Sequence, residues 1–107
     1  MDVGWRQIAM ATLNKVIHQP IRLRIMAALV ALQPDAQMEF TYLRDLLDLT
    51  DGNLGAHLRK LEEVDYVKLR KTFVARKPRT YISTTVKGRK VFKEHVAALE
   101  RILNIGD

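Results

Sequence analysis

The sequence contains no cysteine, no long hydrophobic run and no amino-terminal signal pattern. The lack of cysteine excludes a disulfide framework and a thiolate metal site, and it is typical of a reducing compartment. The first residues, MDVGWRQIAM, lack the basic cluster and apolar core of a signal peptide. The longest nearly apolar run, Ile25 to Leu32, is too short to cross a bilayer. We therefore expect a soluble protein of the cytoplasm with no membrane contact.

Residue patterns that carry catalysis or metal binding are also missing. The three histidines, His18, His57 and His95, do not form a pair at metal-ligand spacing. No glycine-rich phosphate loop and no nucleophile with a neighbouring base occurs in the sequence. Glu94 and Glu100 could join His95 in an oxygen–nitrogen site across a dimer, but a solvated helix face explains them more simply. The sequence therefore predicts neither an enzyme nor a metal or cofactor site.

The length of 107 residues and the hydrophobic fraction of 48% indicate one domain, residues 1–107, with a single core. A domain of this size buries only a modest share of its surface, so further burial between two copies would stabilise it.

Acidic residues are absent from a long basic segment. Between Gln33 and Ala56, five acidic residues accompany one basic residue. Between Asp65 and Glu94 there is no acidic residue, and ten of the eighteen lysines and arginines lie there. Such segregation makes one region electropositive, as expected of a surface that binds a polyanion. An ordinary solvated basic face is the alternative, although solvated faces usually mix both signs.

Apolar spacing predicts two helices in the first third of the chain. The first covers Trp5 to Ile17, with apolar residues mostly three or four positions apart. Pro20 suits the first turn of a second helix, Ile21 to Leu32, because the amide donor that proline lacks is unused there. This helix is apolar on most sides and should lie at the centre of the core. A loop and a short strand, Met38 to Phe40, would follow.

Two short helices joined by a tight turn come next. Thr41 is a suitable N-cap for a helix that ends near Leu47 and turns its leucines inward. The stretch DLTDGN forms the turn, and Thr50 or Asp51 caps a helix that continues to about Val64. The core stripe of this helix is Leu54, Leu58 and Leu61.

The basic segment predicts a β-hairpin. Apolar and basic residues alternate from Val67 to about Lys71, and a second alternating run surrounds Ile82. Because proline cannot donate a ladder hydrogen bond, Pro78 indicates that the connection from Arg76 to Arg79 is a loop.

The last helix carries more apolar surface than one core requires. Thr84 or Thr85 would cap it, and it would run from about Val86 to Leu103. One of its two apolar stripes can cover its own core, whereas the second needs a partner. The alternative is that both terminal helices fold over one core. We predict a homodimer through residues 1–18 and 86–107, with these interface residues: Trp5, Ile8, Val91, Ala98, Leu99, Ile102 and Ile105.

Two helices joined by a short turn and followed by a hairpin make a winged helix-turn-helix, a mainly α fold of the α+β class with a small β-hairpin wing. The stretches LRDLLDLTDGNLGAHLRKLEEVDYVKLRK and RTYISTTVKGRKVF resemble winged-helix transcriptional regulators of the MarR and ArsR type. The resemblance covers about Pro20 to Phe92. Where the family usually has glycine before its Tyr-Val pair, this chain has Asp65, which tolerates a left-handed backbone better than most residues. The matching residues are Thr50, Leu54, His57, Leu58, Leu61, Glu62, Tyr66, Val67, Thr85 and Gly88.

The resemblance implies a dimeric, sequence-specific regulator that binds double-stranded DNA. The second helix of the motif would enter the major groove, and the wing would reach the DNA backbone or minor groove. On the helix, the implied contacts are Thr50, Asp51, Asn53, Ala56, His57, Arg59 and Lys60. On the wing, they are Arg70, Lys71, Arg76, Lys77 and Arg79. The resemblance also leaves room for a small-molecule effector, in a pocket between the dimer helices and the DNA-binding core, but no polar cluster of this sequence identifies such a site.

Two alternatives stay open. His57 either touches a phosphate or base, as the resemblance favours, or is a packed, hydrogen-bonded histidine beside the core leucines. Winged helices also serve as protein-interaction modules in larger assemblies, and such a module would show an exposed apolar patch and little salt dependence.

Overall fold

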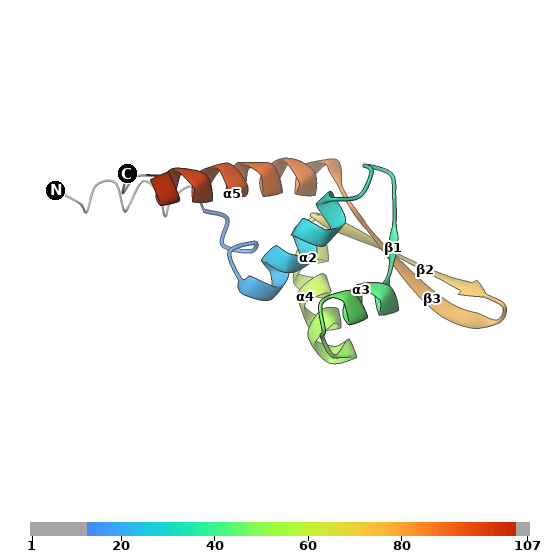
Figure 1. Ribbon diagram of the computed structural model, residues 1–107. Helices are drawn as coiled ribbons and strands as arrows, with labels where there is room; N and C mark the ends of the chain where they lie inside the picture. The colour runs from blue at the N-terminus through green and yellow to red at the C-terminus, as the bar shows by residue number, and fades with distance from the viewer. Residues whose placement is uncertain (1–12, 105–107) are drawn as a thin grey trace.

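The computed structural model describes residues 13–104 (Figure 1). Its elements in chain order are α2 (Pro20–Val30), β1 (Met38–Glu39), α3 (Phe40–Leu46), α4 (Asp51–Glu63), β2 (Val67–Val74), β3 (Lys77–Thr84) and α5 (Val86–Asn104). In Figure 1, α5 lies along one side of α2, and α3 and α4 lie on the other. The hairpin β2–β3 projects away from the carboxyl end of α5. This is the predicted winged helix-turn-helix, with β2–β3 as its wing.

The core lies where α2, α3, α4 and the base of the wing meet. The leucine stripe of α4, Leu54, Leu58 and Leu61, is fully buried, as predicted. It packs with α2 and β3 in one apolar cluster, where each large side chain contributes about 1.5–3 kcal/mol by leaving water. In α3 the prediction was partly wrong, because Leu43 and Leu47 are buried but Leu46 is 53% exposed.

The helix starts show which capping predictions hold. Pro20 is at the first turn of α2, and Thr50 caps α4 by accepting from the backbone N–H of Asn53 at 3.1 Å. Thr41 is not the N-cap of α3. The carboxylate of Glu39 has that role and accepts from both the backbone N–H and the hydroxyl of Thr41.

Both helices of the motif end in a left-handed aspartate. Asp48 follows α3 with φ 55°, and Asp65 follows α4 with φ 62°. After α4, the N–H of Asp65 donates to Glu62 O and that of Tyr66 to Leu61 O, both at 2.9 Å. This pair of bonds is the Schellman ending, which usually has glycine at the left-handed position. The backbone expected at Asp65 is confirmed.

The wing is longer than predicted, and its proline is inside a strand. The sheet order is β1-β3-β2, and β2 and β3 pair from Val67↔Thr84 to Val74↔Lys77. The loop prediction for Lys77 to Arg79 was wrong, because the turn consists of Ala75 and Arg76 alone. Pairs alternate between hydrogen-bonded and non-hydrogen-bonded types in an antiparallel ladder. The closing pair of a two-residue turn is hydrogen-bonded, so Pro78, one residue further along, needs no N–H toward β2.

A close backbone approach joins the wing to α5. Thr85 caps α5, since its hydroxyl oxygen accepts from the N–H of Gly88 at 2.8 Å. A Cβ on Gly88 would lie 2.1 Å from the carbonyl oxygen of Tyr66. Only glycine therefore fits at Gly88 with the backbone where it is.

The predicted helix from residue 5 to 17 falls mostly outside the described residues. Residues 13–19 form turns, so its predicted end at Ile17 was wrong. The side-chain oxygen of Asn14 accepts from the N–H groups of Val16 and Ile17, each at 2.9 Å. Such a local side-chain acceptor competes with helical hydrogen bonding.

Candidate nucleic-acid interface

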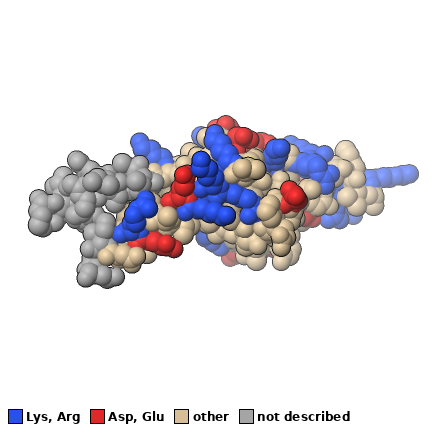
Figure 2. All heavy atoms as spheres, turned by 90° about the horizontal axis from the view of Figure 1, so that it is seen from above, with Lys and Arg blue, Asp and Glu red and all other residues tan. Residues whose placement is uncertain are grey.

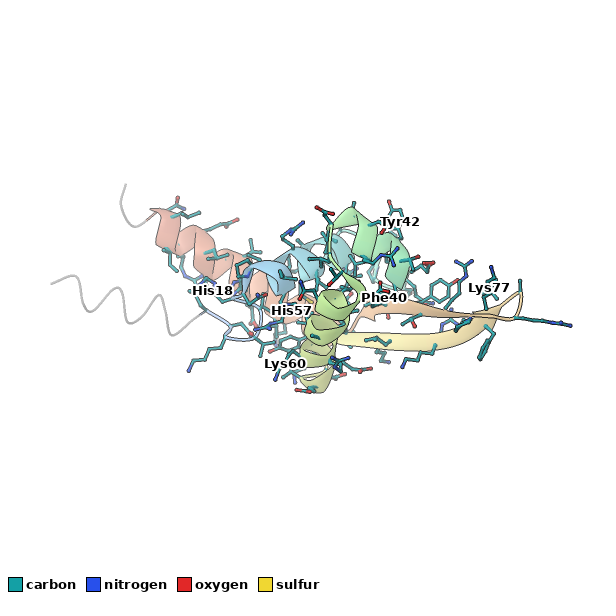
Figure 3. The ribbon with its side chains drawn as sticks, turned by 90° about the horizontal axis from the view of Figure 1, so that it is seen from below. His18, Phe40, Tyr42, His57, Lys60 and Lys77 are labelled. Atoms are coloured by element: carbon teal, nitrogen blue, oxygen red, sulfur yellow. The ribbon has the colours of Figure 1, made fainter. Side chains whose placement is uncertain are left out.

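The helix α4 separates apolar from polar residues around its circumference. Opposite the buried leucines, Asp51, Asn53, Ala56, Arg59 and Lys60 are all exposed. Figure 3 looks at the side of the molecule on which α4 and α3 lie, with Lys60 on α4 and the wing extending past both helices. The small side chain of Ala56 lets this face approach another surface closely. The amide and basic side chains of the same face can donate hydrogen bonds.

His57 is half-buried beside this face and is held by Arg22 of α2. The guanidinium Nη1 of Arg22 lies 3.1 Å from Nδ1 of His57. Because a guanidinium only donates, Nδ1 accepts and the neutral ring carries its proton on Nε2. Burial, and next the charge of Arg22, lower the pKa of His57 below its ordinary value. The structure therefore shows His57 as a packed histidine that is hydrogen-bonded through Nδ1. A DNA contact through Nε2 stays a prediction.

At the start of α4, Asp51 forms an ion pair with Arg44 of α3. The two side chains are 2.8 Å apart, and the same guanidinium binds Asp45 at 2.9 Å. An aspartate at the amino end of α4 would repel a polyanion, and Arg44, shared between two carboxylates, offsets only part of that repulsion. Arg22 and Arg44 were both missed from the sequence, because each acts through a partner on another helix.

The wing divides its predicted cations between two faces. Residues directly opposite in a ladder share a face, and faces alternate along each strand. Lys71 therefore shares the face of Leu69, Ile82 and the core. Arg70 and Arg79 lie on the other face, with Tyr81.

Two of the wing arginines already have partners. Arg79 forms an ion pair with Glu39 at 3.0 Å. Arg70 donates to the side chain of Gln37 at 3.1 Å, and its guanidinium carbon lies 4.9 Å from the ring centre of Tyr81. Among the predicted wing residues, Arg76 at the turn, Lys77 beside it and Lys71 are exposed, and no ion pair of the described residues includes them.

A groove of about 630 Å³ separates α4 from the wing. Arg59 of α4 and Lys71 of β2 line it from opposite sides. Figure 2 looks at the opposite face of the molecule from Figure 3, and basic side chains lie over the wing on that face as well. The groove thus brings one cation of α4, Arg59, and one of the wing, Lys71, to the same site, with Glu62 beside them. The lining residues are Phe40, Gly55, Arg59, Glu62, Leu69, Lys71 and Thr80.

The predicted dimer residues are only partly described. Trp5, Ile8 and Ile105 lie outside the described residues. On α5, Val91, Leu99 and Ile102 are half-buried. Ala98 is 1% exposed, so its burial needs no second copy.

Within residues 13–104, no group of three or more metal-ligating side chains could hold an ion. None of the helices described there is long and apolar enough to cross a membrane.

Comparisons with known proteins agree with this arrangement. A family model described as a winged helix DNA-binding domain matches residues 21–103. An uncharacterized protein of Methanocaldococcus jannaschii is 40% identical over 82 residues, which are 77% of this chain and 86% of that protein. A transcriptional regulator homologue from Pyrococcus horikoshii OT3 is 34% identical with a TM-score of 0.77, covering 86% of this chain and 88% of that one. The S. aureus MepR–DNA complex shares the fold at 17% identity and a TM-score of 0.72, covering 98% and 83% of the two chains.

Proposed function

Because this chain belongs to the winged helix DNA-binding domain family, a class of regulators rather than enzymes, we propose that it regulates transcription by sequence-specific binding to duplex DNA as a homodimer. The observation that carries the proposal is the exposed polar face of α4 beside a basic wing. Leu54, Leu58 and Leu61 fix the helix in the core, so the orientation of its opposite face is also fixed.

The helix α4 enters the major groove and reads base edges. Arg59 follows the buried Leu58 and points away from the core; arginine is the commonest side chain that binds guanine through two hydrogen bonds. Asn53 and Lys60 lie on the same exposed surface. His57 donates from Nε2 to a phosphate, since Arg22 occupies its other nitrogen.

The wing binds the DNA backbone beside the helix. Arg76 and Lys77 at its end, with Lys71 on the groove wall, neutralise phosphates without reading sequence. Arg70 and Arg79 have partners on the other face, so we assign them a smaller share than the sequence suggested.

The test is binding of the whole chain to DNA across a salt series. A duplex selected from a random-sequence pool is compared with a scrambled duplex of equal composition. The selected duplex should bind more tightly, and log K for both should fall by about 0.9 for each phosphate neutralised, giving a slope of several units.

A protein-interaction module is the competing function, and the exposed Tyr42 and Leu46 on α3 favour it. Such a module gives no enriched sequence and a flat response between low and physiological salt. Either result would overturn the DNA-binding proposal.

A further inference from the structure

The outer part of the wing exposes an apolar pair. Phe73 is 73% exposed and stands directly opposite Pro78 in the β2–β3 ladder. Neither residue belongs to the hydrophobic core or packs against it. Fully burying a phenylalanine ring is favourable, so a ring presented this openly is available to a partner.

The pair lies on the face of the wing that borders α4. Phe73 is two residues from Lys71 on β2, and Pro78 is two residues from Thr80 on β3, so all four share one face. Lys71 and Thr80 line the groove beside Arg59. A polyanion seated against α4 and the wing would therefore meet Phe73 on the same side.

The turn beyond the pair is as short as a hairpin allows. Ala75 and Arg76 form the whole connection, with φ of 51° and 68°. Both are left-handed, a conformation that strains residues other than glycine, so this tight turn places an arginine where glycine would fit more easily. A two-residue turn leaves no slack for the ladder to slip. Arg76 in the turn and Phe73, one ladder pair before the closing pair, therefore both lie at the outer end of the wing.

The charge around the pair identifies its partner. From Val67 to Thr84 the chain has six lysines and arginines and no acidic residue. A second copy of this wing would be repelled by the same charge. Duplex DNA complements this surface in two ways, because its phosphates can bind the cations and its base planes can stack on an apolar ring.

We propose that Phe73, backed by Pro78, is a wedge that enters the minor groove, partly unstacks a base step and bends the duplex. The inference rests on the proposed DNA-binding function and adds to it a deformation of the DNA. Apolar side chains that insert between base steps kink DNA toward the major groove by about 20–90°. The wing then discriminates sequences by how easily they kink, without hydrogen bonds to bases.

The experiment measures DNA bending by energy transfer between dyes at the two ends of the selected duplex. The variants are Phe73→Ala and the matched control Val74→Ala, which removes an apolar side chain that is 43% exposed on the other face of the same strand. Phe73→Ala should abolish most of the bend and weaken binding about tenfold, while the salt slope stays unchanged because the same phosphates remain neutralised. Val74→Ala should change neither the bend nor the affinity, and Phe73→Leu should keep part of the bend. Thermal unfolding should be the same for all, since Phe73 supplies no core area.

Three results would overturn the wedge. One is an equal bend with wild-type protein and Phe73→Ala, which leaves DNA binding itself intact. The second is a lower salt slope in Phe73→Ala, which would mean that the wing no longer neutralised its phosphates. The third is a wild-type species larger than a dimer in sedimentation without DNA that disappears in Phe73→Ala, which would make another copy of the chain the partner of the ring. Failure of the wild-type protein to bind any duplex would instead reject the proposed function.

Discussion

Single residues at the ends of helices set the geometry of the motif, and Asp65 is the most informative of them. Its left-handed backbone, at φ 62°, is strained for any residue with a Cβ, although less so for aspartate. Asp65→Gly should remove that strain and raise the free energy of unfolding by about 0.5–1 kcal/mol. Urea unfolding measures the difference. As a control, Asp35→Gly acts in an exposed loop without positive φ and should give no gain. Equal or lower stability for Asp65→Gly would show that the turn carries no strain.

His95 joins α5 to the segment before α2. It is 1% exposed, its Nδ1 accepts from the backbone N–H of Asn14 at 3.2 Å, and its ring centre lies 5.4 Å from that of His18. Burial first, and His18 second, lower the pKa of His95 below its ordinary value of about 6.5. Nδ1 can accept the bond only while it is unprotonated. The folded state therefore holds His95 neutral.

The sign of the resulting pH dependence follows from that pKa. Because the pKa of His95 is lower in the folded state, its contribution to stability is complete above about pH 6.5 and is lost as the pH falls below it. In urea unfolding at about pH 7.5 and about pH 5.5, on either side of that value, His95→Gln should show a smaller difference between the two pH values than the wild type. His18→Gln keeps the burial of His95, so it should retain most of the wild-type difference. An unchanged pH difference in His95→Gln would contradict the assignment.

At the scale of elements, periodic patterns predicted more than local signals did. The leucine stripe of α4 is confirmed because burial on one face imposes a helical period that a sequence displays directly. Among local signals, the cap Thr50 is confirmed, whereas two others were misread. Pro78 was misread because its tolerance depends on ladder register, which follows from the length of the turn and not from proline itself. The cap of α3 was misplaced because Glu39, a carboxylate in a short strand, competes with Thr41.

Contacts between elements far apart in the sequence could not be predicted, for a different reason. The Arg22–His57 bond spans 35 residues, and the Arg79–Glu39 ion pair spans 40. Such pairs exist only once the fold brings the elements together. The sequence could therefore indicate which residues are basic, but not which of them were already bound.

Substitutions in α4 and in the wing should affect DNA binding differently. Arg59→Ala should cost about 1–3 kcal/mol on the selected duplex and blur base preference at one position per half-site. Arg76→Ala with Lys77→Ala should weaken binding to selected and scrambled duplexes alike, and lower the salt slope by about one unit for each phosphate that is no longer neutralised. Titrations of both duplexes across a salt series measure these effects. Loss of specificity in the wing variant, with only general weakening in Arg59→Ala, would reverse the two assignments.

The whole molecule separates its candidate DNA surface from a surface suited to self-association. The wing projects at one end, while the carboxyl-terminal half of α5 extends past the body at the other (Figure 1). On this half, Leu103 is 75% exposed, and Leu99 and Ile102 are half-buried. A second copy meeting α5 there would leave both wings free, so dimerisation and DNA binding could proceed together.

Leu99→Asp tests the predicted dimer, because a charge in an apolar interface would have to be desolvated without a partner. The wild-type protein should sediment as a dimer at micromolar concentration, and the variant as a 12.3 kDa monomer. The neighbouring exposed residue gives a control, Glu100→Ala, which should remain dimeric. A wild-type monomer, or an unchanged dimer in Leu99→Asp, would contradict the interface.

A dimer would also determine how tightly the protein binds a selected duplex. Two linked copies of α4 would contact half-sites about 34 Å apart, and binding of the first raises the effective concentration of the second. Monomeric Leu99→Asp should therefore lose about 100-fold or more in affinity for a selected two-half-site duplex, but much less for a duplex with one half-site. Titration of the two duplexes with wild type, Leu99→Asp and Glu100→Ala separates these effects. Equal losses on both duplexes would mean that the Leu99→Asp substitution damages the DNA-binding domain itself rather than the link between two copies.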